Sequence, residues 1–149
     1  MWHSRRVMTD SASTAIPAGK RILVVDDHLD FANFVRRVAE KEGFVAELVD
    51  TAEAFRKAYA EVQPAIICLD IVMPEEDGIE LIQWLTGQQC KAAIYIITGH
   101  NPSYARAALE IGRSQGLNIA GVLQKPVSLL TLRDVLSAAG EGRTAIAAD

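Results

Sequence analysis

The sequence has few of the features that mark disulfide-stabilised, membrane or nucleic-acid-binding proteins. It contains only two cysteines, Cys68 and Cys90, and their spacing matches neither a metal knuckle nor a redox pair. No apolar run approaches the roughly 20 residues that a membrane span needs, and the first residues lack the apolar core of a secretory signal. The net charge of −4 argues against nucleic acid as a direct partner. We therefore expect a cytoplasmic protein with free, buried thiols that binds neither membranes nor nucleic acid directly.

What is present suits one globular domain. The 149 residues are 50% hydrophobic and 23% charged, and a chain of this length can bury a core without covalent staples. Residues 1–19 are rich in Ser, Thr and Ala and predict a flexible leader, and residues 140–149 have weak periodicity and predict a tail. The domain is expected over residues 20–139, and with no effector domain after Ala139 the protein is expected to have a single domain.

Apolar runs and helical patterns alternate along this domain. Strands are predicted at 21–27, 44–50, 65–70, 93–99 and 119–124, and helices at 29–43, 51–62, 78–87, 102–116 and 128–139. Thr51 and Ser128 are predicted N-caps, and Gly43 is a predicted C-cap. Continuous apolar strands are typical of a parallel sheet covered on both faces. The pattern predicts an α/β fold, (βα)₅, with a doubly wound parallel five-stranded sheet in which strands one and three are neighbours.

Polar residues stand at the carboxyl ends of these strands, where open α/β sheets bind their ligands. Asp26 and Asp27 end the first strand, Asp70 ends the third, Thr98 ends the fourth, and Lys125 follows the fifth. Three converging carboxylates would repel one another, and a divalent cation would relieve that repulsion. Oxygen ligands favour Mg²⁺. An ammonium and a hydroxyl beside it complete a candidate phosphoryl-transfer site, with Asp70 as the nucleophile that forms an aspartyl phosphate.

Each of these residues also has a simpler interpretation. The Asp26–Asp27 pair could cap a helix, Asp70 could be a turn acid, Thr98 a strand residue and Lys125 a solvated lysine. These interpretations must all hold together by coincidence at one sheet edge. His28 follows the acidic pair and is expected to be an exposed residue at the start of a helix rather than a metal ligand.

Four motifs together resemble the receiver domain of two-component response regulators. They are "VVDD" (24–27), "LDIVMPEEDG" (69–78), "IITG" (96–99) and "QKP" (124–126), and the resemblance covers residues 20–139. One such motif alone would be weak, but four in order at the ends of the right strands are specific. The resemblance implies the flavodoxin-like strand order 2-1-3-4-5.

The resemblance also implies a role for each residue. Asp70 corresponds to the phosphoacceptor, which a sensor histidine kinase or a histidine phosphotransfer protein would phosphorylate. Asp26, Asp27, Asp70 and the backbone carbonyl of Val72 correspond to the Mg²⁺ ligands. Lys125 corresponds to the lysine that pairs with the phosphoryl group, and Thr98 to the switch hydroxyl.

Further expectations come from the same resemblance. The Lys125–Pro126 bond is expected to be cis, and Pro74 and Gly78 are expected to shape the loop after Asp70. The residue at His100, like Val72, is expected to tune water access, although His100 could equally be a simple loop histidine. A downstream protein effector, or a second copy in a homodimer, is expected on the face formed by the fourth helix, the fifth strand and the fifth helix.

Two departures from the family pattern are visible. Val122 stands three positions before the lysine, where the family usually has an aromatic residue, so a ring flip there cannot report phosphorylation. Lys125 lies 27 positions after Thr98, a few more than a minimal receiver has, so the fourth helix or its exit loop is expected to be extended.

Two other classes of function fit parts of the same pattern. A Mg²⁺-dependent phosphohydrolase that forms an aspartyl phosphate would commonly carry its nucleophile on the first strand, whereas here it is on the third, and no cap insertion encloses a substrate. A receiver-like docking module that is never phosphorylated is opposed by the intact acids but favoured by Val122. We therefore expect a phosphoaccepting signalling domain and not an enzyme.

Overall fold

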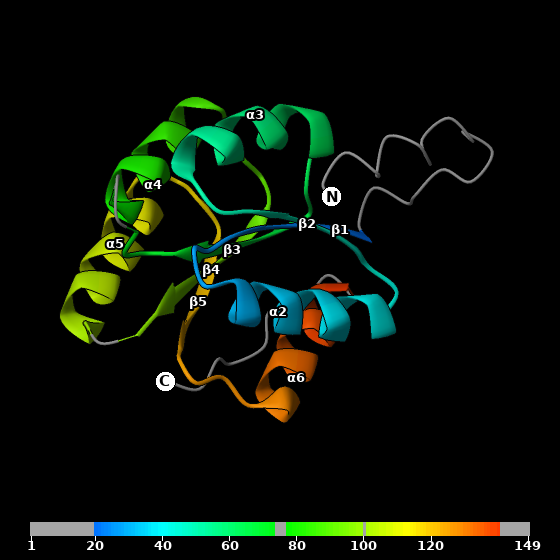
Figure 1. Ribbon diagram of the computed structural model, residues 1–149. Coiled ribbons are helices and arrows are strands. Elements are labelled where there is room, and N and C mark those ends of the chain that lie inside the picture. Colours follow the sequence, from blue (N-terminus) through cyan, green and yellow to red (C-terminus); the bar gives the residue numbers. More distant parts are fainter. Residues whose placement is uncertain (1–19, 74–76, 100, 141–149) are drawn as a thin grey trace.

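The computed structural model describes residues 20–73, 77–99 and 101–140, which form five strands and five helices (Figure 1). The predicted leader, most of the predicted tail, Pro74 and His100 lie outside the described residues. In chain order the elements are β1 (Arg21–Val25), α2 (Leu29–Lys41), β2 (Val45–Val49), α3 (Ala52–Val62), β3 (Ile66–Asp70), α4 (Gly78–Gly87), β4 (Ala93–Thr98), α5 (Pro102–Ser114), β5 (Ile119–Gln124) and α6 (Leu129–Gly140).

The strands form one parallel sheet in the order β2-β1-β3-β4-β5, which confirms the predicted fold. β3 is buried along its whole length, as its continuous apolar sequence predicts for a central strand covered on both faces. The register pairs Val25 of β1 with Leu69 of β3 and Thr98 of β4 with Gln124 of β5. The carboxyl ends of these four strands therefore lie along one edge of the sheet.

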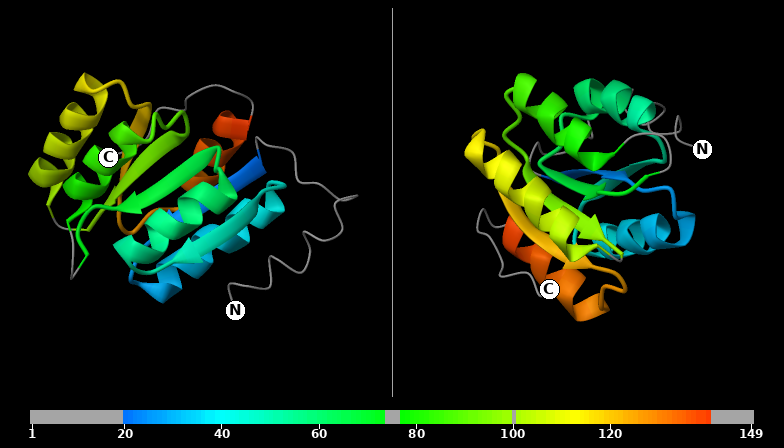
Figure 2. Two further views of the ribbon diagram at one scale, coloured as in Figure 1. Left: turned by 90° about the horizontal axis from the view of Figure 1, so that it is seen from above. Right: turned by 90° about the vertical axis from the view of Figure 1, so that its left-hand side faces the viewer.

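Helices cover both faces of the sheet, α2 and α6 on one and α3, α4 and α5 on the other (Figures 1 and 2). Successive strand side chains point to opposite faces. Thus Leu23 and Leu69 pack into the core under α3, α4 and α5, whereas Val24 and Cys68 pack into the core against α2 and α6. Each strand therefore contributes to two cores, which explains why the apolar runs are continuous rather than alternating.

Local signals place the helix ends as expected. The Thr51 hydroxyl accepts a hydrogen bond from the Ala54 N–H (3.1 Å), and the Ser128 hydroxyl accepts one from the Thr131 N–H (3.0 Å). α2 ends at Lys41, and Gly43 follows it with a φ of 90°, a left-handed conformation that glycine adopts without strain.

The predicted strands 21–27 and 44–50 are longer than the observed β1 and β2. Their ladder ends at the Val25–Val49 pair, and only one further hydrogen bond follows, from the Asp26 N–H to the Val49 carbonyl (3.1 Å). The chain then turns at the sheet edge into the loop before α2, which carries Asp27 out of the sheet. Because β1 ends at Val25, Asp26 and Asp27 lie just beyond the strand, at the carboxyl edge of the sheet.

Gly78, which was predicted to shape the loop after Asp70, is the first residue of α4 and contacts the residue that begins that loop. Its N–H donates a hydrogen bond to the Ile71 carbonyl (2.9 Å), and a Cβ built on Gly78 would lie 2.5 Å from Ile71 Cδ1 and 2.7 Å from Ile71 Cα. Only glycine permits this approach of the helix to the residue that follows Asp70.

Cys68 and Cys90 are both buried free thiols, as expected. Within residues 20–73, 77–99 and 101–140, no helix combines the length and the apolar character that a membrane crossing requires.

Candidate functional site

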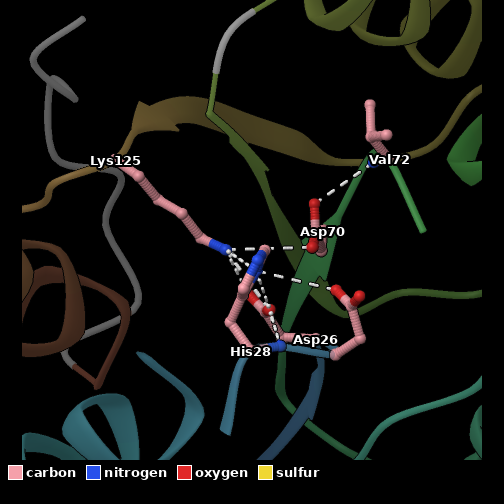
Figure 3. Close-up of polar contacts among 6 residues, drawn as sticks. Asp26, His28, Asp70, Val72 and Lys125 are labelled. Atoms are coloured by element: carbon pink, nitrogen blue, oxygen red, sulfur yellow. Dashed lines mark hydrogen bonds and ion pairs between the residues drawn. The ribbon is translucent and has the colours of Figure 1, made fainter. Parts of the chain in front are cut away.

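The sheet edge brings together the charged residues that the sequence placed at separate strand ends. Because Val25 pairs with Leu69, the residues that follow them in register are Asp26 and Asp70. The Lys125 N–H donates a hydrogen bond to the Thr98 carbonyl (2.8 Å), which ties the segment after β5 to the end of β4. The Lys125–Pro126 peptide bond is cis, as predicted. Figure 3 shows the Lys125 side chain extending toward the acids.

The Lys125 ammonium lies among carboxylates and over an aromatic ring. Its Nζ is 3.0 Å from Asp26 Oδ2 and 3.8 Å from Asp70 Oδ2. The same Nζ lies 4.7 Å from the centroid of the Phe31 ring of α2, a cation–π arrangement that helps to hold the side chain. One cation therefore faces two buried acids, and the pocket keeps an excess of negative charge.

Of the two buried acids, Asp70 lies farther from the Lys125 ammonium. It is 4% exposed, its Oδ1 accepts a hydrogen bond from the Val72 N–H (3.2 Å), and its buried Oδ2 accepts none from the described residues. Burial, followed by repulsion from Asp26, raises the pKa of Asp70 to about 7, although Lys125 and the Val72 N–H act to lower it. Such a carboxylate is poised to gain a cation or an electrophile.

The other predicted site residues differ in their exposure to solvent. Asp26 is buried, whereas the Asp27 side chain is 30% exposed at the rim. Thr98 is buried, and its hydroxyl makes no hydrogen bond with any residue that the structure describes. Val72 has an exposed side chain and directs its backbone N–H to Asp70.

His28 contacts the acids although sequence reasoning assigned it no role. It is exposed at the N-cap of α2, as expected, but its Nδ1 lies 3.4 Å from Asp26 Oδ1, 3.6 Å from Asp27 Oδ1 and 3.1 Å from Lys125 Nζ. Asp26, Asp27, His28 and Asp70 each offer one ligand atom, and these atoms all lie within 4.8 Å of one another. Phe31, three residues after His28 in the chain, was likewise not among the predicted site residues. The available signal was the position of His28 directly after the acidic pair and of Phe31 in the first turn of the helix that follows.

Comparison with known proteins identifies the family of this fold and site. The family model described as "Response regulator receiver domain" matches residues 22–137. The chain belongs to this family. Receiver domains are signalling domains that are phosphorylated on an aspartate, bind Mg²⁺ through an acidic pocket, and interact with histidine kinases and downstream effectors.

Curated relatives and solved structures agree with that assignment. The receiver is 34% identical to the response regulator receiver protein CpdR of Brucella abortus, over 76% of this chain and 90% of CpdR. It is 26% identical to the photosynthetic apparatus regulatory protein RegA of Rhodobacter capsulatus, over 90% of this chain and 70% of RegA. The structure of the NtrX receiver domain from Brucella abortus superimposes with a TM-score of 0.70 at 27% identity, covering 80% of this chain and 98% of that one.

Other relatives are much longer than the matched region. The match to the transcriptional regulatory protein GltR of Pseudomonas aeruginosa covers 33% of GltR, and the match to BvgA of Bordetella pertussis covers 45% of BvgA. The matched regions therefore span less than half the length of these regulators.

Proposed function

We propose that this receiver accepts a phosphoryl group on Asp70 from a histidine kinase or a histidine phosphotransfer protein. The observation that carries the proposal is the buried Oδ2 of Asp70, which accepts no hydrogen bond from the described residues and lies 3.8 Å from Lys125 Nζ. A buried carboxylate oxygen without a donor costs stability, so its retention at a strand end is best explained by a reaction.

The transfer forms one bond and breaks one. A carboxylate oxygen of Asp70 attacks the phosphorus, and the bond from phosphorus to the donor imidazole nitrogen breaks, with its electron pair remaining on that nitrogen. The attacking oxygen must be unprotonated. Lys125 contributes here because its ammonium opposes the rise in the pKa of Asp70.

The side chains present fit Mg²⁺. Asp26, Asp27 and Asp70 supply carboxylate oxygens from two neighbouring strand ends, and the backbone carbonyl of Val72 is the fourth proposed protein ligand. Hard oxygen ligands in this number suit an ion that keeps part of its water shell. When bound, the ion would offset charge on the acids and on the phosphoryl oxygens.

Lys125 and Thr98 are proposed to bind the phosphoryl group after transfer. Lys125 Nζ already faces Asp70, and an ammonium can follow a new anion over a short distance because its stem is flexible. The buried Thr98 hydroxyl, which has no hydrogen bond within the described part of the chain, can donate to a phosphoryl oxygen. The Thr98 carbonyl and the Lys125 N–H are already hydrogen-bonded, so movement at one residue reaches the other.

We propose that the α5–β5–α6 face reports this change to a downstream protein or to a second copy of the chain. Val122 is half-buried on β5 and packs at the border of the core under α3, α4 and α5, where its short side chain has no ring to rotate. Movement of Thr98 and of the loop after β4 would then carry the signal. The same residue favours the second candidate, a docking module that works without phosphorylation.

Intact-mass measurement separates the two candidates. The protein is incubated with Mg²⁺ and acetyl phosphate, and the wild type is expected to gain the mass of one phosphoryl group. Asp70→Asn should gain none. Asp50→Asn is the matched control, because Asp50 is an exposed acid directly after β2 at the same sheet edge, and it should be phosphorylated like the wild type. An unmodified wild type with several phosphodonors would refute phosphorylation and favour the docking module.

A further inference from the structure

We propose that His28 is an additional metal ligand of this receiver, which makes the pocket favour a first-row transition-metal dication such as Mn²⁺ over Mg²⁺. The inference rests on the proposed metal site and adds to it a nitrogen ligand from the chain's own sequence. It names a residue that determines which cation the site prefers.

The imidazole is placed for this role by its contacts. His28 Nδ1 lies 3.4 Å from Asp26 Oδ1 and 3.6 Å from Asp27 Oδ1, so it faces the two acids that precede it. Figure 3 shows the ring beside Asp26, with the Lys125 ammonium and the Asp70 carboxylate close by. A ligand atom from each of the three acids and one from His28 lie within 4.8 Å of one another, a spacing that a single ion could bridge after small side-chain movements.

Two further observations point to a cation at this position. The Oδ2 of Asp70 is buried and accepts no hydrogen bond from the described residues, although it faces the same pocket. Lys125 Nζ lies 3.0 Å from Asp26 Oδ2 and 3.1 Å from His28 Nδ1, so an ammonium already stands where the carboxylates and the imidazole converge. The His28 imidazole nitrogen and the Asp26 carboxylate thus contact the same positively charged group, the Lys125 ammonium.

The helix does not require this histidine. His28 occupies the N-cap of α2, but its side chain makes no capping hydrogen bond, and only its backbone N–H bonds to Asp26 Oδ1 (2.8 Å). The ring is 69% exposed and so adds little to the core. Neither packing nor capping sets the orientation of Nδ1, which instead faces the Lys125 ammonium and the two acids, the position at which a bound cation would lie.

Ligand chemistry sets the expected selectivity. Mg²⁺ binds oxygen ligands and keeps much of its water shell, so an imidazole nitrogen gains it little. Transition-metal dications accept mixed nitrogen and oxygen ligands, and Mn²⁺, although it takes carboxylate and water ligands as Mg²⁺ does, binds N/O sites at the weak end of that series. Removing His28 should therefore weaken Mn²⁺ binding more than Mg²⁺ binding.

The experiment compares both ions on the full chain. Dissociation constants for Mn²⁺ and Mg²⁺ are measured by calorimetry for the wild type and for His28→Asn, which keeps a residue favoured at an N-cap. The Mn²⁺ affinity is expected to fall about ten-fold or more, on the scale seen when groups that support metal ligands are removed. The Mg²⁺ affinity is expected to change by less than about three-fold, because Mg²⁺ gains little from an imidazole.

A spectroscopic readout tests ligation directly. Pulsed electron paramagnetic resonance of the Mn²⁺-loaded wild type should show coupling to a coordinated imidazole nitrogen, and His28→Asn should lose it. The protein contains three histidines, so a variant with His3→Asn and His100→Asn is the control and should keep the coupling.

The outcomes separate this inference from the function on which it rests. Equal losses of Mn²⁺ and Mg²⁺ affinity in His28→Asn, or a nitrogen coupling that survives in it, would overturn the role of His28 and leave the metal site intact. If neither ion binds the wild type, or if Asp27→Asn binds both ions as the wild type does, the proposed metal site itself fails.

Discussion

Replacing Asp70 by asparagine should stabilise the metal-free protein at neutral and alkaline pH. The substitution keeps the size of the side chain and removes its charge. Burial and repulsion from Asp26 raise the pKa of Asp70 from 3.8 to about 7 in the folded protein. Between these two pH values the folded state binds more protons than the unfolded state, so the stability of the wild type falls as the pH rises and levels off above about pH 7.

The size of the effect follows from the same pKa values. Each pKa unit corresponds to about 1.4 kcal/mol, so the change from 3.8 to about 7 sets an upper limit of about 4 kcal/mol. Between pH 5 and pH 8 only about two of these pKa units count, which lowers the limit to about 2.7 kcal/mol. Partial solvent access to the pocket and adjustment of Lys125 reduce it further, and we expect a gain of about 2 kcal/mol for Asp70→Asn at pH 8 relative to pH 5.

Urea unfolding at a series of pH values, in the presence of a chelator, measures this difference. Asp50→Asn is the matched control because its side chain is exposed, and it should stay within about 0.5 kcal/mol of the wild type at every pH. Saturating Mg²⁺ should reduce the stability difference between Asp70→Asn and the wild type. An ion bound beside the Asp70 carboxylate would stabilise the folded wild type, whereas the asparagine offers it no charge. Parallel stability curves for the wild type and Asp70→Asn would refute the view that Asp70 carries uncompensated charge.

Other substitutions test separate parts of the structure. Lys125→Met should raise the pKa of Asp70 above about 7, because Lys125 acts to lower it, and carboxyl carbon NMR titration would detect the change. Gly78→Ala should destabilise the fold by about 2 kcal/mol in urea unfolding, because the new methyl group would overlap the Ile71 backbone. Asp77→Ala should cost about 1 kcal/mol by the same measurement, because Asp77 Oδ1 accepts the Glu80 N–H at the start of α4 (3.0 Å). An unchanged pKa in the first case, or unchanged stability in the others, would contradict these contacts.

The strand–helix alternation and the sheet were predictable because they depend on local patterns. Continuous apolar runs such as the one before Asp70 can be satisfied only by burial on two faces, and Thr51 and Ser128 cap their helices through contacts three residues away. The meeting of Asp26 and Asp70 was also predictable, because a parallel sheet gathers the carboxyl ends of its strands at one edge. The ends of β1 and β2 were predicted too late, because the acids after Val25 and Val49 were counted with the strands, whereas the ladder stops where each apolar run stops.

Other features depend on how distant elements pack. The orientation of α2 on the sheet decides that the Phe31 ring lies under Lys125 Nζ and that His28 Nδ1 faces Asp26, and no periodicity in the sequence encodes that orientation. The raised pKa of Asp70 likewise depends on burial and on a carboxylate from another strand. The sequence by itself determined which residues reach the edge of the sheet. The tertiary structure decided their distances and their exposure to water, and electrostatic energies depend on both.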